Sequence, residues 1–400
     1  MNSNVLNDVV SELDPYCPTT LRNPYPAHEK LRQAGPLIRL PQYGIWAMAR
    51  FKEVRGALND HTTFLSGGGV GLSDIRKDPN PVIARRLTLE IDPPDHTKYR
   101  AVLMRVLSPL TVRKLRADFA KAAEELVDDL LQKRNVEGAK DVAEAFPMKV
   151  FPDAIGIRQE GREHLLRWSD TAFNSFGPVN DIFKASLPTG LAAFEWVTDC
   201  CSRENLSPGG LGAMIYEASD KGEIGPDDAP LLVRPLMGAG VDTTVSAIGT
   251  MLYGLASHPD QWELLRSNPA LARAAFEEAV RWDSPIQSFC RTTSREVEID
   301  GVRVPEGAKI VMLLGAANRD PQRWTDPELY RIERDTQGHV GFGSGIHACV
   351  GQMIARLEGE VLLTALINRV KTISLAGAPE YALNNTVRSL ARLPLELMPA

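Results

Sequence analysis

A cysteine in a glycine-rich stretch is the first place where the residue types of this sequence could do chemistry. Glycines alternate from position 341 to position 345 in the stretch Gly341–Gln352, and Cys349 follows them. Alternate glycines suit neither a helix interior nor a strand, so the backbone is expected to turn sharply or to approach something flat. An amphipathic helix is predicted from Gln352 onwards, which places the thiol at a helix N-terminus, where the dipole favours a thiolate.

Three uses of Cys349 are open on these residues alone. The thiol could be a small buried hydrophobe, a zinc ligand together with His347, or the ligand of a planar cofactor. A core cysteine needs no glycine-rich approach, and no second ligand pair at zinc spacing appears in the chain. A thiolate bound to a planar cofactor needs nearby backbone N–H groups and no side chains between ring and backbone, so the pattern favours that use.

An acid next to a hydroxyl is the second candidate for chemistry. The sequence predicts a helix from about Pro226 to His258 with a kink at Pro235, and its centre reads Ala-Gly-Val-Asp-Thr-Thr over residues 239–244. A glycine there costs about 1 kcal/mol relative to alanine, and a buried carboxylate costs more. Asp242 and Thr243 could be a stray acid and a hydroxyl bonded to its own helix. Alternatively, Thr243 donates a hydrogen bond to a reactive oxygen species and Asp242 relays protons.

Charged residues at helical spacing supply further candidates. His96 and Arg100 are four residues apart and share one helical face, either as a surface cation pair or as an anion-binding pair. Glu278 and Arg281 form an E-x-x-R pair on a helix predicted over residues 270–281, which by itself is a common surface ion pair.

The elements that must position these residues are predicted to be mainly helical. Helices are expected at residues 24–34 and 52–58 and over most of residues 112–221, with a long loop at 67–82. Short strands are expected at residues 37–40, 44–48, 297–299, 302–304 and 309–313.

Composition limits the possible functions. The 400 residues contain no linker, so a single domain over 1–400 is expected, with a short flexible N-terminus at 1–15. A net charge of −6 does not suggest nucleic acid as a partner. Five scattered cysteines and an N-terminus without signal-peptide features indicate a reducing cytoplasm. The best membrane candidate, residues 236–256, contains Asp242 and is interpreted as a buried helix, so no membrane association is expected.

In combination, these motifs resemble those of the cytochrome P-450 family. The stretch from Phe342 to Gly351 is similar to the family's haem-binding loop, and Asp242 with Thr243 to its acid-alcohol pair. Glu278 and Arg281, followed in order by the segment from Trp324 to Arg334, are similar to the Glu-Arg-Arg cluster that braces the loop. The resemblance covers essentially the whole chain and implies a mainly α, triangular fold with a long central helix and small β-sheets.

The resemblance also implies a cofactor and an activity. The cofactor is a haem b with Cys349 as the axial thiolate, which pushes electron density onto the iron and favours O–O cleavage. The residues that match the family's other haem contacts are Phe342, Gly351, His96, Arg100, Arg291 and His347, the last four towards the propionates. The implied activity is that of an O2-dependent monooxygenase. A haem-thiolate gas sensor is the non-enzyme alternative, but a sensor has no need of Asp242 and Thr243.

Electrons are expected from outside the chain. They come from NAD(P)H through a separate [2Fe-2S] ferredoxin and ferredoxin reductase, because the chain contains no flavin or iron–sulfur domain. A ferredoxin could dock near the proximal face, where Arg105, Arg113 and Lys114 supply positive charge, or these residues simply form a solvated helix face. The protein is expected to be a monomer.

Within the family, the chain resembles bacterial enzymes that O-demethylate para-methoxybenzoates. The residues that match an apolar slot for an aromatic ring are Phe173, Phe176, Ile286 and Phe289, although a phenylalanine pair can equally be core. That group holds the substrate carboxylate partly through serines one and four residues after the arginine that corresponds to Arg234. Those positions are Pro235 and Gly238 here, and Arg86 could replace them as the carboxylate partner.

A small aromatic acid from lignin catabolism is therefore the expected substrate. The alternatives are a neutral methoxyphenol of the guaiacol type and another small hydrophobic molecule.

Overall fold

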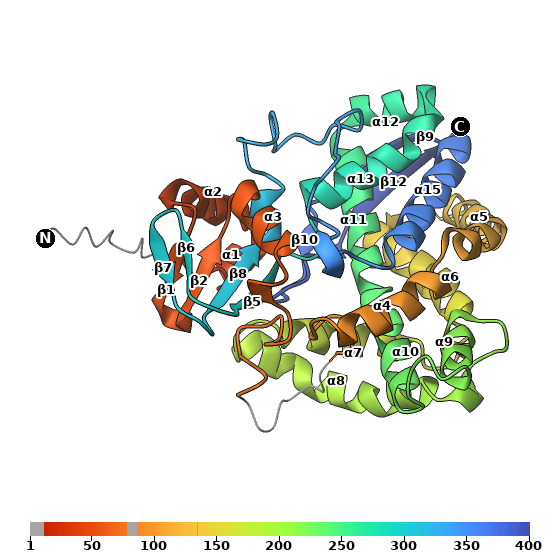
Figure 1. Cartoon of the computed structure of the whole chain (residues 1–400). Helices are drawn as coiled ribbons and strands as arrows, with labels where there is room; N and C mark the ends of the chain where they lie inside the picture. Colours follow the sequence, from red (N-terminus) through yellow and green to blue (C-terminus); the bar gives the residue numbers. More distant parts are fainter. Residues whose placement is uncertain (1–11, 78–85, 134) are drawn as a thin grey trace, which may run out of the picture.

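Helices form most of the structure; the largest sheet lies on the left in Figure 1, and the sheet that contains the C-terminal strand lies on the opposite side. The computed structural model describes residues 12–77, 86–133 and 135–400. The helices are α1 (Pro18–Arg22), α2 (Tyr25–Ala34), α3 (Phe51–Asn59), α4 (Asp95–Val106), α5 (Pro109–Leu130), α6 (Ala145–Ile155), α7 (Glu163–Asn174), α8 (Asp181–Cys200), α9 (Leu211–Asp220), α10 (Asp228–Ala239), α11 (Asp242–Ser257), α12 (Pro259–Ser267), α13 (Ala272–Trp282), α14 (Leu314–Ala317) and α15 (Gln352–Arg369). Shorter turns of 3-10 or π-helix are η1 (Pro41–Tyr43), η2 (Gly138–Glu144), η3 (Arg203–Asn205), η4 (Pro269–Leu271) and η5 (Gly345–His347).

The largest sheet has the strand order β1-β2-β8-β5-β3. Its strands are β1 (Ile38–Leu40), β2 (Ile45–Met48), β3 (Phe64–Leu65), β5 (Ser288–Thr293) and β8 (Lys309–Leu313). Strands β2 and β8 are parallel, with Trp46 opposite Ile310, and the other pairs are antiparallel. The remaining strands are β4 (Val136–Glu137), β6 (Val297–Ile299), β7 (Val302–Val304), β9 (Val370–Leu375), β10 (Glu380–Tyr381), β11 (Leu390–Arg392) and β12 (Pro394–Pro399).

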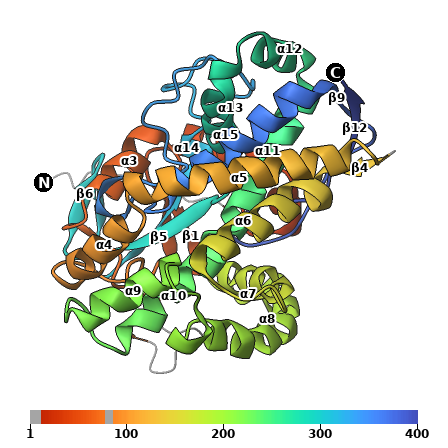
Figure 2. The same ribbon diagram turned by 90° about the vertical axis from the view of Figure 1, so that its right-hand side faces the viewer.

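Helix α11 lies at the centre of the main hydrophobic core. Residues 244–252 of this helix are buried without a break, as expected for a helix that is apolar all round. It packs against η2, α13, β9 and α12, and the same core includes side chains of α5, α6 and α15. Helices α7 and α8 lie side by side at one edge of the molecule, where they pack closely against each other (Figures 1 and 2). A mainly α architecture with small sheets was predicted, and the structure confirms it.

One predicted helix is divided into two. The helix expected over residues 226–258 continues through Pro235 and breaks at Gly240 and Val241, between α10 and α11. Pro235, where a kink was predicted, lies inside α10, and the kink stays a prediction. At Gly240 a side chain would overlap the ring of Phe151, so the backbone comes close to α6 there. The hydroxyl of Thr243 also bonds back to the carbonyl oxygen of Ala239, which competes with regular helix pairing.

The other predictions for secondary structure can be compared directly. The strands expected near residues 37–48 and 297–313 are present as β1, β2, β6, β7 and β8, whereas β5 and the C-terminal strands were missed. The loop expected at 67–82 has no helix or strand up to residue 77; residues 78–82 lie outside the described residues. Residues 1–11 of the expected flexible N-terminus also lie outside them. Among the helices that the structure describes, none is long and apolar enough to cross a membrane.

Candidate active site

A cavity of about 260 Å³ lies where α7, α10 and α11 face the loop before α15. Its lining includes Cys349 and Thr243, which are separated by 106 positions in the chain, and the aromatic residues of α7. The thiol, the hydroxyl and the aromatic slot identified in the sequence therefore share one enclosed space.

The loop of Cys349 has the sharp turns that its glycines predicted. Gly343 and Gly345 have φ angles of +70° and +69°, which side-chain-bearing residues rarely adopt. At Gly345 a Cβ atom would also lie 2.5 Å from the carbonyl oxygen of Leu58 in α3. The N–H group of Cys349 donates to the carbonyl oxygen of Phe342 at 2.7 Å, and this bond closes the loop just before α15 begins.

The protonation of Cys349 differs from the prediction. Backbone N–H groups of Gly351 and Gln352 lower the pKa of the thiol, as expected at the start of a helix. Burial raises the pKa by more, so the net shift is upwards from the ordinary value. The helix N-terminus alone therefore does not favour the thiolate. A bound metal cation would do so, because coordination deprotonates a thiol outright.

Two imidazole rings and two guanidinium groups gather next to this loop. The ring centroids of His96 and His347 are 4.2 Å apart. The Nε2 atom of each ring is buried and has no hydrogen-bond partner among the described residues, while Nδ1 of His347 lies 3.1 Å from the carbonyl oxygen of Thr88. Arg100 and Arg291 line the cavity together with His347. Burial lowers the pKa of His347 to about 3, so the ring is neutral. The carbonyl oxygen of Thr88 only accepts, so Nδ1 carries the ring proton and Nε2 is an acceptor; Nε2 donates to an anionic oxygen only when that anion raises the pKa enough to protonate the ring.

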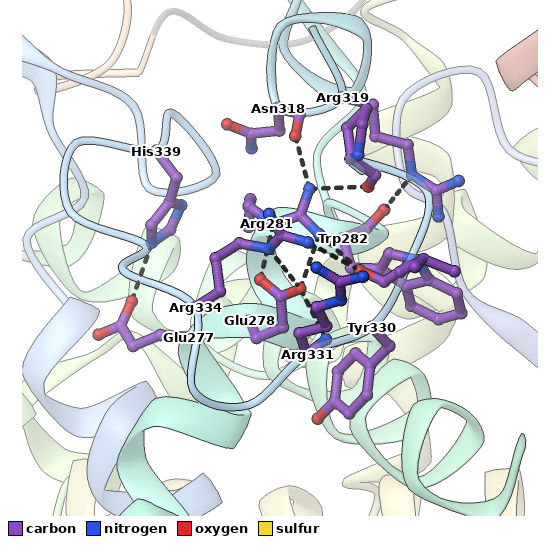
Figure 3. Close-up of polar contacts among 12 residues, drawn as sticks. Glu277, Glu278, Arg281, Trp282, Asn318, Arg319, Tyr330, Arg331, Arg334 and His339 are labelled. Atoms are coloured by element: carbon purple, nitrogen blue, oxygen red, sulfur yellow. Dashed lines mark hydrogen bonds and ion pairs between the residues drawn. The ribbon is translucent and has the colours of Figure 1, made fainter. Parts of the chain in front are cut away.

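Buried ion pairs that involve α13 lie next to the Cys349 loop and are drawn in Figure 3. The guanidinium of Arg281 donates to both carboxylate oxygens of Glu278 at 2.6 and 2.7 Å, and both side chains are fully buried. Arg334 donates to the same carboxylate at 3.1 Å. The guanidinium of Arg281 also donates to the carbonyl oxygen of Asn318, whose side-chain oxygen accepts the N–H of Val340 immediately before the loop. The E-x-x-R pair is thus connected to the cysteine loop through Asn318.

Sequence reasoning missed a second link between α13 and this loop. Glu277 accepts a hydrogen bond from Arg356 of α15 and lies 2.9 Å from Nε2 of His339 (Figure 3). His339 and Arg356 lower the pKa of Glu277 to about 2 in spite of its burial. Glu277 is adjacent to Glu278 in sequence, but nothing in its spacing distinguishes it from an exposed helical acid.

The side chains of Asp242 and Thr243, at the start of α11, lie in different surroundings. Thr243 lines the cavity and donates to the carbonyl oxygen of Ala239 at 2.6 Å. Asp242 faces α7, where Ser169 donates to its carboxylate at 2.8 Å. Burial raises the pKa of Asp242 to about 7, with smaller contributions from the nearby acids Asp170 and Glu144. Ser169 was not identified from the sequence, because it is 73 positions from its partner.

Three phenylalanine rings form an aromatic slot in the cavity. Phe173 and Phe176 make an edge contact with centroids 6.0 Å apart, and Phe176 makes another with Phe289 at 5.6 Å. All three rings line the cavity, as does Ile286. The slot predicted from these four residues is therefore assembled in the structure, from α7 and from the chain at β5.

Of the two arginines expected near the polar end of the substrate, only one lines the cavity that the structure describes. The guanidinium of Arg86 lies over the ring of Phe176 at 4.4 Å and pairs with Glu90 at 3.2 Å. Its Nη2 atom is buried without a hydrogen-bond partner among the described residues. Arg234 instead extends over the ring of Phe194, although Gly238, four residues later, does line the cavity.

Comparison with known proteins gives the family. The family model described as Cytochrome P450 matches residues 265–394. The chain is 51% identical over 389 residues to Cytochrome p450 CYP199A2 of Rhodopseudomonas palustris, with 97% of this chain and 94% of that protein covered. The chain belongs to the cytochrome P450 family. It is also 30% identical over 395 residues to the vitamin D(3) 25-hydroxylase of Pseudonocardia autotrophica, with 96% of each chain covered.

Solved structures of other P450 proteins have the same fold. One is cytochrome P450 CREJ in complex with (4-ethylphenyl) dihydrogen phosphate, with a TM-score of 0.86, 25% identity and coverage of 96% of this chain and 99% of that one. Another is P450BioI in complex with an acyl carrier protein ligated to hexadec-9Z-enoic acid, with a TM-score of 0.84, 27% identity and coverage of 95% and 100%. The predicted P450 fold is confirmed.

P450 enzymes are monooxygenases that hold haem through a cysteine thiolate and receive electrons from NAD(P)H through redox partner proteins. When bound, the haem supplies the activation of O2. The cavity fits this cofactor: Cys349 is the one described cysteine in its lining, and the guanidinium groups of Arg100 and Arg291 in the same lining suit propionate oxygens. His347 also lines the cavity and could donate to a propionate once protonated, whereas His96 lies outside the lining, in ring contact with His347. A zinc site would need more ligands, and no group of three or more His, Cys, Asp or Glu side chains among the described residues could hold a metal ion.

Proposed function

We propose that this P450 oxidises a small, flat aromatic ether, and that its reaction is the oxidative O-demethylation of a para-methoxybenzoate. One oxygen atom of O2 joins the methyl carbon, and the bond between that carbon and the ether oxygen then breaks to leave a phenol and formaldehyde. The second oxygen atom leaves as water. The reaction consumes two electrons from the redox partners and two protons.

The proposed residue roles combine the resemblance to the family with the contacts described above. Cys349 binds the haem iron, and the residues that hold the propionates are His96, Arg100, Arg291 and His347. Thr243 turns its hydroxyl from the carbonyl oxygen of Ala239 to donate into the cavity. Asp242 supplies protons to it, and a pKa of about 7 suits an acid that must both give and regain a proton near neutrality.

The single observation that carries the substrate assignment is the position of Arg86 beside the aromatic slot. Its Nη2 atom is a buried donor without a partner among the described residues, and leaving such a donor unpaired costs about 1–3 kcal/mol. A carboxylate on an aromatic ring would satisfy that donor while the ring packs against Phe176. The charge-assisted hydrogen bond is stronger than one to a neutral oxygen.

A neutral methoxyphenol of the guaiacol type is the second candidate. The observation that favours it is the ion pair between Arg86 and Glu90, in which both side chains are largely buried. Glu90 already balances the charge of Arg86, and it would repel a second carboxylate at short range. A phenol carries no charge near neutrality, so a neutral substrate avoids that repulsion.

The test compares the two ligands on one variant. In Arg86→Ala, the affinity for 4-methoxybenzoate should fall at least tenfold, whereas the affinity for guaiacol should change by less than about threefold, because a lost hydrogen bond to a charged group is worth ~1.5–3 kcal/mol. Spin-state titrations measure both affinities, and formaldehyde release measures turnover. Equal losses for the two ligands would refute a carboxylate contact.

A matched control exists at the surface. Arg203 also combines an ion pair, to Asp220, with a position over an aromatic ring, that of Tyr216 at 4.9 Å, but outside the cavity. Arg203→Ala should leave the affinity for both ligands unchanged.

For the electron donor, we propose a [2Fe-2S] ferredoxin that docks on the face where α5 begins. Arg113 and Lys114 are exposed there. Arg105 is already paired with Glu223 at 2.6 Å, which leaves it less suited to this role than the sequence indicated.

A further inference from the structure

The indole ring of Trp168 lies directly on the bare Cα of Gly238. A Cβ atom at position 238 would lie 3.2 Å from Cε3 and Cη2 of the ring and closer still to Cζ3. Both residues line the cavity. A glycine inside α10 costs about 1 kcal/mol relative to alanine, so its presence is explained by this close approach.

Helix α7, which carries Trp168, cannot easily move away from α10. On one side, Thr171 donates to the carbonyl oxygen of Ser186 in α8 at 2.7 Å, and a side chain at Gly190 would overlap Thr171. On the other side, Ser169 is bonded to Asp242 of α11. A side chain added at position 238 must therefore displace the indole ring rather than the helix, and the ring can move into the cavity that it lines.

The cavity wall around this contact is poor in polar groups, because the hydroxyl of the neighbouring Ser169 is already donated to Asp242. Gly238 has no side chain and Pro235 has no N–H group, and both line the cavity. Arg234 is directed over Phe194 instead. A charged or strongly polar substituent placed against this wall would lose its hydration without gaining a partner.

We propose that Trp168, which packs on Gly238, determines which substrates this P450 accepts. The indole ring limits how far a substrate extends along the cavity, and the part of the substrate that contacts the indole ring is apolar. The inference rests on the P450 active site but not on methoxybenzoate as the substrate. A substrate that does carry a carboxylate must direct it to Arg86 and not to α10.

Iron-ligating probes test this length limit without knowledge of the substrate. An imidazole nitrogen binds haem iron, so 4-phenylimidazole and its longer biphenyl analogue extend from one fixed point by different lengths. Trp168→Leu should raise the affinity for the biphenyl compound relative to 4-phenylimidazole at least tenfold. An unchanged ratio would overturn the length limit.

The contact with Gly238 is tested by combining substitutions. In the native background, Gly238→Ser should weaken 4-phenylimidazole binding at least tenfold, because the displaced indole fills the cavity. In the Trp168→Leu background, the same substitution should change the affinity by less than about threefold. The same factor in both backgrounds would refute the coupling.

The carbon monoxide difference spectrum and thermal unfolding confirm that each variant binds haem and folds. If Gly238→Ser does not fold, the change in affinity ratio caused by Trp168→Leu still decides the proposal.

Trp196 provides the control, because it makes a similar contact away from the cavity. A side chain at Gly161 would overlap the indole of Trp196, but Trp196 is not part of the cavity wall that the structure describes. Trp196→Leu should leave the affinity ratio of the two imidazoles unchanged, and a tenfold rise there would overturn the assignment to Trp168. If methoxybenzoates cause no spin-state change while the imidazoles behave as expected, the proposed substrate fails and the role of Trp168 stands.

Discussion

On the side of Cys349, the cavity is held by buried ion pairs and backbone hydrogen bonds, whereas on the side of Thr243 it is formed by ring contacts and by helices that approach each other over glycines. We call the first the proximal brace (Glu278, Arg281, Asn318, Arg334 and the loop 341–351) and the second the distal wall (α7, α10 and the start of α11). The side chains of Glu278, Arg281, Asn318 and Arg334 are all hydrogen-bonded to other parts of the chain. In the distal wall, Gly238 and Pro235 contribute no polar side chain, and Arg86 beside the wall has a buried Nη2 atom without a hydrogen-bond partner among the described residues.

This difference separates cofactor binding from substrate choice. Ion pairs and hydrogen bonds require particular geometries, so the brace can hold one loop in one position. Apolar contacts are less directional, so the wall can change its shape through single residues. Substitutions in the brace should therefore affect the cofactor and the fold, whereas substitutions in the wall should affect coupling and selectivity.

The largest effect is expected at Cys349. Cys349→Ala should abolish the red-shifted Soret band that a haem-thiolate gives with carbon monoxide, because no other described cysteine lines the cavity. The carbon monoxide difference spectrum measures this. Cys17→Ala, at a half-buried cysteine outside the cavity, should keep the band. A normal band in Cys349→Ala would end the assignment.

The next largest effect is expected within the brace. Arg281→Ala leaves the fully buried carboxylate of Glu278 with fewer partners, and breaking a buried pair in this way costs about 3–5 kcal/mol. Urea unfolding and haem retention should both report the loss. The control, Arg331→Ala, removes a pair with Asp326 in which the arginine side chain is 47% exposed, and should cost less than about 1 kcal/mol. Similar losses in the two variants would contradict a bracing role.

At the distal wall, Thr243→Ala should leave stability and haem binding nearly intact but lower the share of turnovers that give product. Without the hydroxyl to donate into the cavity, the reaction is expected to release hydrogen peroxide in place of product. The ratio of NADH consumed to formaldehyde and to peroxide formed measures this coupling. Thr364→Ala, at an exposed threonine of α15, is the control. Unchanged coupling in Thr243→Ala would remove Thr243 from the proposed role.

A further effect concerns the pH dependence of stability. The pKa of Asp242 is raised to about 7 from 3.8, so its contribution to stability is complete below about pH 3.8 and is lost as the pH rises through about 7. Asp242→Asn should therefore gain stability relative to the native protein over that window, as urea unfolding at several pH values would measure. A difference that does not change between pH 4 and 8 would contradict the raised pKa.

A substitution at Ser169 tests the raised pKa of Asp242 a second time. Its hydrogen bond lowers the pKa of Asp242, so Ser169→Ala should move the midpoint of this pH dependence upwards, by up to about one unit for a bond of ~1.4 kcal/mol. A shift downwards, or none, would show that the hydroxyl does not act on the carboxylate. A purely structural role of Ser169 would alter stability at all pH values alike.

The sequence by itself determined the parts of the site that depend on short spacing. The glycines before Cys349 and the three-residue step from Glu278 to Arg281 specify local geometry, and the structure places them as predicted. A helix or tight loop brings residues three or four positions apart together whatever surrounds it.

Only the tertiary structure decided the contacts between distant segments. The bond from Ser169 to Asp242, the indole of Trp168 on Gly238, and the direction of Arg234 away from the cavity all depend on how α7, α8 and α10 pack. The ring of Phe151, which is 89 positions from Gly240 in the chain, lies where a side chain at Gly240 would stand. Packing is collective, so a residue's neighbours across helices follow from the shape of the whole core and not from its own spacing.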